Sequence, residues 1–347
     1  MPNLKSLAKD TAIYGLSSIV ARFVNYLLVP IQTMRFTADG GEYGVITNVY
    51  AYTALLIIVL TYGIETTFFR FMNKDGESRD KVYSTTLRMV GFTSLLFCIL
   101  VVLFRQPLAD IMGYGDHPEY VWVLFVTVGI DAFSCILFDY LRCIHRPIKF
   151  AVLKIAAIVL NILLNILYLI VMPELHLNPF GIYDSAFHLD VAWVFYINMF
   201  CTISTTLLLW RECKGITNGF DKLLCKRMLA YSMPIFVMGI AGQLNQCLSQ
   251  ILFPYLYDGT PREASTQLGI YGACIKVAMI MVMITQAFRF AYEPFVFGKS
   301  RDSDYKETYA KVMKFYIIFT LLAFLAVVGY IDVLRYVVGK SYWDGLR

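Results

Sequence analysis

The sequence predicts an all-α membrane protein that crosses the bilayer many times. Of its 347 residues, 58% are hydrophobic and 16% are charged, whereas a soluble domain has about 45–50% and about 25%. Apolar runs long enough to cross ~30 Å of hydrocarbon recur along the whole chain. These runs are continuously apolar and about twice as long as a barrel strand, so they exclude a β-barrel. They leave no room for a separate soluble domain.

Hydropathy and turn-forming residues divide the chain into nine predicted transmembrane helices. Turn signals such as "TADGGE", "NKDGES" and "DGTPRE" separate the apolar runs. The predicted helices cover residues 11–34, 44–69, 84–104, 120–141, 152–173, 191–210, 228–256, 268–297 and 315–333.

The positive charges are distributed unevenly between the two sides of the membrane. Twenty of the 30 Lys and Arg residues fall in the N-terminal tail and the loops of one side, and six fall on the other side. Because Lys and Arg accumulate in cytoplasmic loops, we expect a cytoplasmic N-terminus. The loops of the opposite side are short, the longest lying near 174–190. We therefore expect neither a receptor ectodomain nor an external catalytic loop.

Two parts of the sequence resemble each other. The helices near 44–69 and 268–297 overlay with a constant shift of 228 residues, which places Tyr43-Gly44 on Tyr271-Gly272 and Glu65 on Glu293. Because six helices separate the copies, both start on the same side of the membrane. Parallel repeats of this kind are typical of two-lobed alternating-access transporters, although chance similarity stays an alternative.

The repeat predicts a division of the chain into two lobes. We expect a six-helix lobe at 1–214 and a partial lobe of three helices at 215–347, joined by the polar and basic segment 211–227. The second lobe is three helices shorter than the first. We therefore expect the sequence to be a truncated form of a longer chain.

The first predicted helix carries Ser18, Arg22 and Asn25 on one face, at spacings i, i+4 and i+7. A guanidinium at the bilayer centre costs at least ~2.5–3.5 kcal/mol and needs a partner or a wet cavity. Pairing with Asp131, in the middle of the fourth helix, is one explanation. The other is that Arg22 faces a central cavity, where its planar fork would bind the phosphate oxygens of an anionic substrate. We favour the cavity.

Other polar side chains complete the candidate site. Gln243 and Gln246 are expected to line the same cavity, although amides also join transmembrane helices, the role we expect for Asn161, Asn165 and Asn198. Asp131 could take up a proton or coordinate a cation and so couple transport to an ion gradient. Lys154 is expected to anchor its helix at the membrane surface. The remaining candidate charges are Glu65, Lys276, and the i, i+4 pair Arg289 and Glu293, for which a structural ion pair is the alternative role.

The cysteines and histidines show no pattern of catalytic or metal-binding residues. The eight cysteines contain no C-x-x-C pair, and most lie inside apolar runs, where packing is the expected role. The four histidines are scattered through loops. We therefore predict no catalytic residues, no metal site, no cofactor and no nucleic-acid partner.

The stretches "YGLSSIVARFVNYLLVPIQTMRF", "EYGV", "TYGIETTFFRFMN" and "QAFRFAYEPFVF" resemble O-antigen and capsule flippases. These belong to the multidrug/oligosaccharidyl-lipid/polysaccharide exporter superfamily. The resemblance implies a MATE-like, two-lobed helical bundle in the bacterial inner membrane. It implies translocation of a polyprenyl-diphosphate-linked oligosaccharide by alternating access, for surface polysaccharide or lipopolysaccharide assembly. We expect a proton or sodium gradient, coupled through Asp131, as the energy source, and a polysaccharide polymerase and other assembly proteins as partners.

The resemblance carries over one residue and leaves two rival functions. Arg22 matches, by its position in the first helix, the cavity arginines that contact the diphosphate in related lipid II flippases. The corresponding Gln246 is not cationic. Family members usually have twelve or fourteen helices, more than the nine predicted here. The alternatives are a multidrug exporter of the same fold and, in a different class, a membrane enzyme of glycan polymerisation.

Overall fold

The computed structural model describes residues 20, 23–178, 182–183, 188–299 and 305–346. Within these ranges the chain is helical and contains no strand, which confirms the predicted fold class. The elements in chain order are α2 (Leu28–Arg35), η1 (Ala38–Gly40), α3 (Glu42–Thr61), α4 (Ile64–Met72), α5 (Arg79–Leu103), α6 (Arg105–Ile111), α7 (Glu119–Cys143), α8 (Pro147–Ile166), the π-helical η2 (Leu167–Val171), α9 (Met172–Glu174), α10 (Val191–Leu208), η3 (Glu212–Asn218), α11 (Lys222–Leu256), α12 (Pro261–Lys299), α13 (Tyr305–Gly329), α14 (Ile331–Leu334), η4 (Arg335–Val337) and η5 (Lys340–Leu346).

Seven helical stretches within the described residues are long and apolar enough to cross a membrane. An eighth is obtained if α13 and the following helix, bent by 64°, count as one span. They correspond to the second to ninth predicted helices. The first predicted helix, 11–34, lies mostly outside the described residues, where only 23–26 and α2 follow its helical pattern. The chain is thus a multi-pass membrane protein, and the count of nine stays a prediction.

Most helices begin earlier than the hydropathy pattern indicates, because polar residues form their first turns. Helix α11 begins six residues before its predicted start, capped by Asp221, whose Oδ1 accepts hydrogen bonds from the backbone N–H of Leu223 (2.9 Å) and Leu224 (3.0 Å). The hydrogen bond from Leu224, assisted by that from Leu223, holds the pKa of Asp221 below its usual value. Such caps supply the hydrogen bonds that the free N–H groups of a first turn lack.

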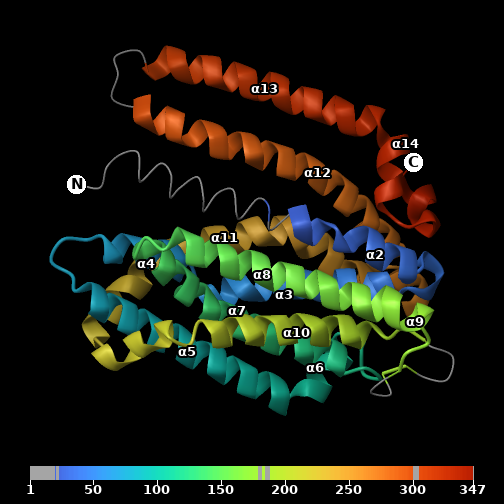
Figure 1. Cartoon of the computed structure of the whole chain (residues 1–347), viewed down its shortest axis with the longest axis horizontal. Coiled ribbons are helices and arrows are strands. Elements are labelled where there is room, and N and C mark those ends of the chain that lie inside the picture. The colour runs from blue at the N-terminus through green and yellow to red at the C-terminus, as the bar shows by residue number, and fades with distance from the viewer. Residues whose placement is uncertain (1–19, 21–22, 179–181, 184–187, 300–304, 347) are drawn as a thin grey trace.

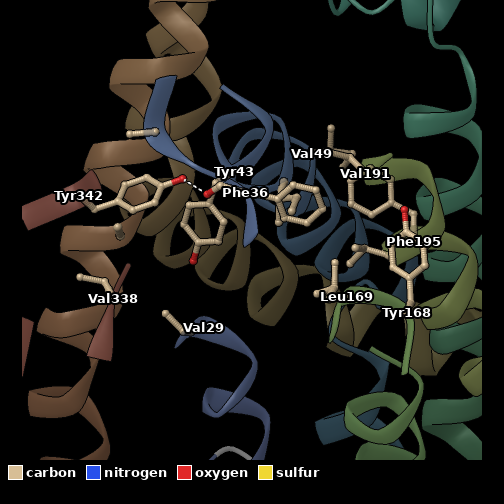
Figure 2. Close-up of a cluster of buried hydrophobic side chains, with 14 of the residues drawn as sticks. Val29, Phe36, Tyr43, Val49, Tyr168, Leu169, Val191, Phe195, Val338 and Tyr342 are labelled. Carbon is tan, nitrogen blue, oxygen red and sulfur yellow. Dashed lines mark hydrogen bonds between the residues drawn. The ribbon is translucent and has the colours of Figure 1, made fainter. Parts of the chain in front are cut away.

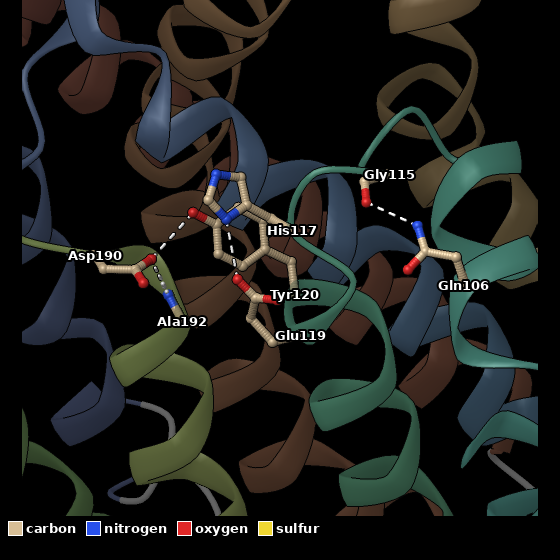
Figure 3. Close-up of polar contacts among 7 residues, drawn as sticks. All are labelled: Gln106, Gly115, His117, Glu119, Tyr120, Asp190 and Ala192. Atoms are coloured by element: carbon tan, nitrogen blue, oxygen red, sulfur yellow. Dashed lines mark hydrogen bonds and ion pairs between the residues drawn. The ribbon is translucent and has the colours of Figure 1, made fainter. Parts of the chain in front are cut away.

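A second capping network lies at the opposite end of the bundle (Figure 3). The Oδ1 atom of Asp190 accepts hydrogen bonds from the backbone N–H of Ala192 (2.9 Å), at the start of α10, and from the hydroxyl of Tyr120 in α7 (3.0 Å). Beside it, His117 stacks on the Tyr120 ring and its Nδ1 lies 3.0 Å from Glu119 Oε1. These contacts fix α7 against α10 where both helices begin.

The predicted helix 44–69 is broken in two. Tyr62 and Gly63, between α3 and α4, both adopt left-handed backbone conformations, with φ of 35° and 70°. A β-carbon on Gly63 would lie 3.0 Å from the backbone N of Phe236 in α11. The break therefore brings the chain against α11 at a point where only glycine fits without strain.

Figure 1 shows how the helices are arranged. Helices α3, α5, α7, α8 and α10 pack together, α11 packs against α3 and α4, and α12 packs against α3. We call the end that holds the starts of α3, α7, α10 and α12 the outer end and the opposite end the inner end, after the predicted orientation. Helix α12 meets the bundle at the outer end and runs away from it towards the inner end, beside α13.

A buried aromatic cluster closes the outer end (Figure 2). The hydroxyl of Tyr342, in η5, donates a hydrogen bond of 2.6 Å to the backbone carbonyl of Phe36, and its ring packs edge-on against Tyr43 with ring centres 5.6 Å apart. The hydroxyl of Thr33 accepts a hydrogen bond from the Gly339 N–H (2.9 Å). Segments separated by about three hundred residues in sequence thus join in one core.

The backbones of α3 and α12 touch at the same end. A β-carbon on Gly44 would lie 1.8 Å from the carbonyl oxygen of Ser265, and one on Gly272 would lie 2.3 Å from the hydroxyl oxygen of Thr47. Gly44 and Gly272 are the two glycines that the sequence repeat places in register. Small residues at such positions allow transmembrane helices to approach closely.

Candidate functional site

The candidate site is a polar cavity between α3, α8, α10, α11 and α12, which we call the central cavity. It has a volume of about 320 Å³. Asn25 and Gln32 reach it from the segment around α2, and Asn161, Asn165 and Asn198 reach it from α8 and α10. Its other polar lining residues are Tyr43, Thr47, Tyr50, Gln243, Gln246, Gln250 and Lys276. The lining thus offers many uncharged hydrogen-bonding groups and one ammonium group among the described residues.

Helix α11 presents a row of amides to this cavity. Gln243, Gln246 and Gln250 are spaced i, i+3 and i+7, so they share one helix face. Gln243 and Gln246 are the two predicted from the sequence. Gln250 was missed, although the same spacing could have revealed it.

The asparagines of the cavity also connect helices and neighbouring turns. The Asn165 amide donates a 2.6 Å hydrogen bond to Asn161 Oδ1, and Asn198 Nδ2 donates one of 3.0 Å to the hydroxyl of Tyr50 in α3. The predicted packing role fits these contacts. The sequence could not show that the same side chains line the cavity.

Lys276 is the charged residue of the central cavity. It lies in α12 with a half-buried side chain, and the hydroxyl of Tyr26 donates a hydrogen bond of 2.8 Å to its backbone carbonyl. Within the described part of the chain it forms no ion pair. An ammonium group without a carboxylate partner in a polar cavity favours an anionic ligand.

A second cavity, which we call the side cavity, adjoins the central one and has a volume of about 450 Å³. The two share Asn25, Asn161 and Asn198 as lining residues. The side cavity is lined by Asp131, Thr202 and Lys154 among others. Asp131 and Lys154 bring opposite charges into one space.

Lys154 was expected to anchor its helix at the membrane surface. In the structure its ammonium lies 4.5 Å from the centre of the Phe138 ring, and Lys154 lines the side cavity with Asp131. The contact with an aromatic face stabilises a cation away from bulk water. No pattern in the sequence indicates this contact, because it depends on how α7 packs against α8.

Other predicted site residues lie elsewhere or outside the description. Glu65, expected as a cavity charge, lies in α4 beside Cys135 and Asp139 of α7. Ser18 and Arg22 fall outside the described residues, as do the side chains of Arg289 and Glu293. The choice between an Arg22–Asp131 pair and a cavity-facing Arg22 therefore stays open, and the pair Arg289–Glu293 stays a prediction.

Comparisons with known proteins agree with this architecture. Residues 39–344 match the family described as "Polysaccharide biosynthesis protein". An inward-facing multidrug resistance MATE family transporter of the MOP superfamily is similar in structure, with a TM-score of 0.65 at 14% identity, over 98% of this chain and 78% of that one. MATE in the straight conformation gives a TM-score of 0.46 at 12% identity, over 98% and 84%. No curated protein matches the sequence.

At 14% identity, the likeness to the inward-facing transporter shows the fold alone, and it confirms the MATE-like bundle that the sequence resemblance implies. The family match covers most of the chain. The chain therefore belongs to the polysaccharide biosynthesis protein family.

Proposed function

We propose that this protein is a flippase that moves a polyprenyl-diphosphate-linked oligosaccharide across the bacterial inner membrane for surface polysaccharide assembly. The family and the MATE-like fold support a membrane transporter. The observation that carries the substrate class is Lys276, a cation with no ion pair among the described residues, in a cavity otherwise lined by amides and hydroxyls.

The chemistry of the lining suits such a head group. An ammonium group and the N–H donors of Gln243, Gln246 and Gln250 can satisfy diphosphate oxygens. Amides both donate and accept hydrogen bonds, so the same lining can also bind sugar hydroxyls. In the side cavity, the carboxylate of Asp131 shares its space with Lys154. That neighbouring positive charge disfavours a cationic drug as the main substrate.

The proposed cycle uses the two lobes of the sequence analysis, 1–214 and 215–347, which would rock against each other around the central cavity. The N-terminus would be cytoplasmic. Asp131 would take up a proton or sodium ion from the side cavity and couple its gradient to the cycle. Arg22 would provide a second cation for the diphosphate, and a polysaccharide polymerase would receive the product.

A complementation experiment tests the proposal. In cells that lack this gene, the lipid-linked oligosaccharide should accumulate, and the wild-type protein should relieve this. Lys276→Met removes the charge at similar length and should restore export less than a tenth as well. A loss of ~1.4 kcal/mol in binding is already tenfold, and Lys276→Arg should retain most of the activity. Lys226→Met, an exposed lysine at the start of α11, is the matched control.

Each outcome has a defined meaning. Full rescue by Lys276→Met, at equal protein levels in the membrane, would overturn the assigned binding site. If the lipid-linked oligosaccharide does not accumulate in cells that lack the gene, the substrate class is overturned. Resistance to cationic drugs that depends on the gene would then favour the multidrug exporter. Glycan chains that stop at one repeat unit, with normal translocation of that unit, would favour the polymerase.

A further inference from the structure

Three potential metal ligands meet in the inner half of the bundle, and none of them lines the central cavity or the side cavity. Cys135 and Asp139 are one turn apart on α7, and Glu65 lies in the first turn of α4, just after the break at Gly63. One ligand atom from each of the three residues lies within 4.8 Å of the others. They come from two helices, so no spacing in the sequence reveals them.

Asp139 provides a second observation that points to a ligand. Its side chain is 4% exposed, and its Oδ1 accepts a hydrogen bond of 3.2 Å from the Arg142 guanidinium. Its Oδ2 is buried and has no hydrogen-bond partner. A buried carboxylate oxygen without a donor is costly. A bound cation would satisfy it, while Arg142 holds the other oxygen and orients the group, as outer partners of metal ligands do.

The trio has an access route. Cys135 lines a third cavity of about 390 Å³ together with Asp131, Ser134, Phe138 and Lys154. Asp131, Ser134, Phe138 and Lys154 also line the side cavity. An ion can therefore reach the thiol from the side cavity, and the same space has room for a water molecule as a fourth ligand.

We propose that Glu65, Cys135 and Asp139 form a binding site for a divalent metal ion of the zinc class. One thiolate and two carboxylates, completed by water, suit the tetrahedral coordination of Zn²⁺. The sulfur ligand disfavours Mg²⁺ and Ca²⁺, which take oxygen ligands. On binding, the S–H bond of Cys135 breaks, its proton leaves to solvent and the thiolate binds the metal.

The surrounding charges set the conditions for binding. Arg142 contacts Asp139 from the same helix, and Lys154 approaches from α8. Both are positive and oppose a cation, while Asp131, which lines the same cavity as Cys135, adds a carboxylate. Metal binding should therefore release a proton and weaken as the pH falls. This inference goes beyond the proposed transport function and does not depend on it.

Cobalt titration of the purified full-length protein in lipid nanodiscs tests the site, because Co²⁺ bound to thiolate absorbs in the near ultraviolet. We expect one Co²⁺ per chain with this absorption, displaced by Zn²⁺. Cys135→Ser should abolish the absorption and Asp139→Asn should weaken binding. Cys98→Ser, a half-buried cysteine of α5 that is not part of the trio, should leave both unchanged.

Alkylation of the wild-type protein gives a second readout that needs no variant to fold. Bound Zn²⁺ should slow maleimide modification of Cys135, followed by mass spectrometry, by at least about tenfold, since the free thiolate is the reactive form. Cys98 should react at the same rate with and without Zn²⁺. The site would be overturned if Co²⁺ produced no thiolate absorption, or if the absorption persisted in Cys135→Ser. It would also be overturned if Zn²⁺ did not change the rate at which Cys135 is alkylated. The flippase proposal would stand after any of these, because no transport is measured.

Discussion

The contact between α3 and α12 at the outer end makes Gly44→Ala an informative substitution. The new β-carbon would lie 1.8 Å from the carbonyl oxygen and 2.7 Å from the carbonyl carbon of Ser265. Both atoms belong to the backbone, so no side chain can turn away to make room. Ordinary contact begins near 3.4 Å, so the two helices must separate by about 1.6 Å at this point.

The expected magnitude follows from the cost of overpacking. Inserting a methyl group into a closely packed contact costs typically ~1–3 kcal/mol. The cost applies to the conformation in which the outer end is closed and not to one in which α3 and α12 have separated there. Gly44→Ala should therefore shift the ratio of closed to open molecules by about 5–150-fold towards the open form.

Distance measurements between spin labels can detect this shift. One label at Asp39, in the turn before α3, and one at Asp258, in the turn before α12, report the separation of the two helices at the outer end. The native cysteines are replaced first, and wild-type and variant proteins are compared in the same nanodiscs. Gly44→Ala should add or enlarge a population at longer distance.

A matched glycine provides the control. Gly242 lies in α11, and a β-carbon there would meet no atom within 4 Å. Gly242→Ala should therefore leave the distances unchanged. If Gly44→Ala gives the same distance distribution and the same thermal stability as the wild type, the reasoning from the backbone contact is refuted.

Two further predictions concern stability, measured as free energies of unfolding in one detergent. Tyr342→Phe leaves the buried carbonyl of Phe36 without its 2.6 Å hydrogen bond and should cost about 1–3 kcal/mol; a change below about 0.5 kcal/mol, the usual range for surface substitutions, would contradict the role of this bond. Lys149→Met removes the ammonium 2.5 Å from Glu212, whose side chain is 7% exposed, and should cost ~3 kcal/mol. By contrast, Arg35→Met breaks an ion pair whose Glu174 is 65% exposed and should cost ~0–1 kcal/mol. If Lys149→Met and Arg35→Met lowered the free energy of unfolding equally, burial of the acidic partner would not decide the cost of breaking an ion pair.

The existence of the helices could be predicted because it depends on local composition. Runs of about 20 apolar residues can satisfy their backbone groups in lipid only as helices. The helix ends were less accurate, since they depend on polar first turns such as the one that Asp221 caps. The break at Tyr62 and Gly63 was also missed. A single glycine within an apolar run does not distinguish a continuous helix from a broken one.

The site could be predicted where its residues share one helix. The spacing of Gln243 and Gln246 on α11 predicted a polar face, and that face does line the central cavity. Contacts between helices gave no such signal. The meeting of Glu65 with Cys135 and the position of Lys154 beside Phe138 both depend on the packing of α7 against its neighbours. The repeat identified Gly44 and Gly272 as equivalent, but only the structure shows that both lie where α3 meets α12.

The chemistry of that glycine contact bears on how often the protein can open and close. At Gly44 the touching groups are main-chain atoms, and the Gly44 N–H makes its hydrogen bond to the carbonyl of Gly41 along its own chain segment. Separating these atoms leaves no hydrogen-bond donor or acceptor without its partner. Only dispersion attraction is lost, and each atom pair contributes ~0.1–0.2 kcal/mol of it. In the proposed cycle, the contact at Gly44 can part and re-form without a salt bridge or a side-chain hydrogen bond to break.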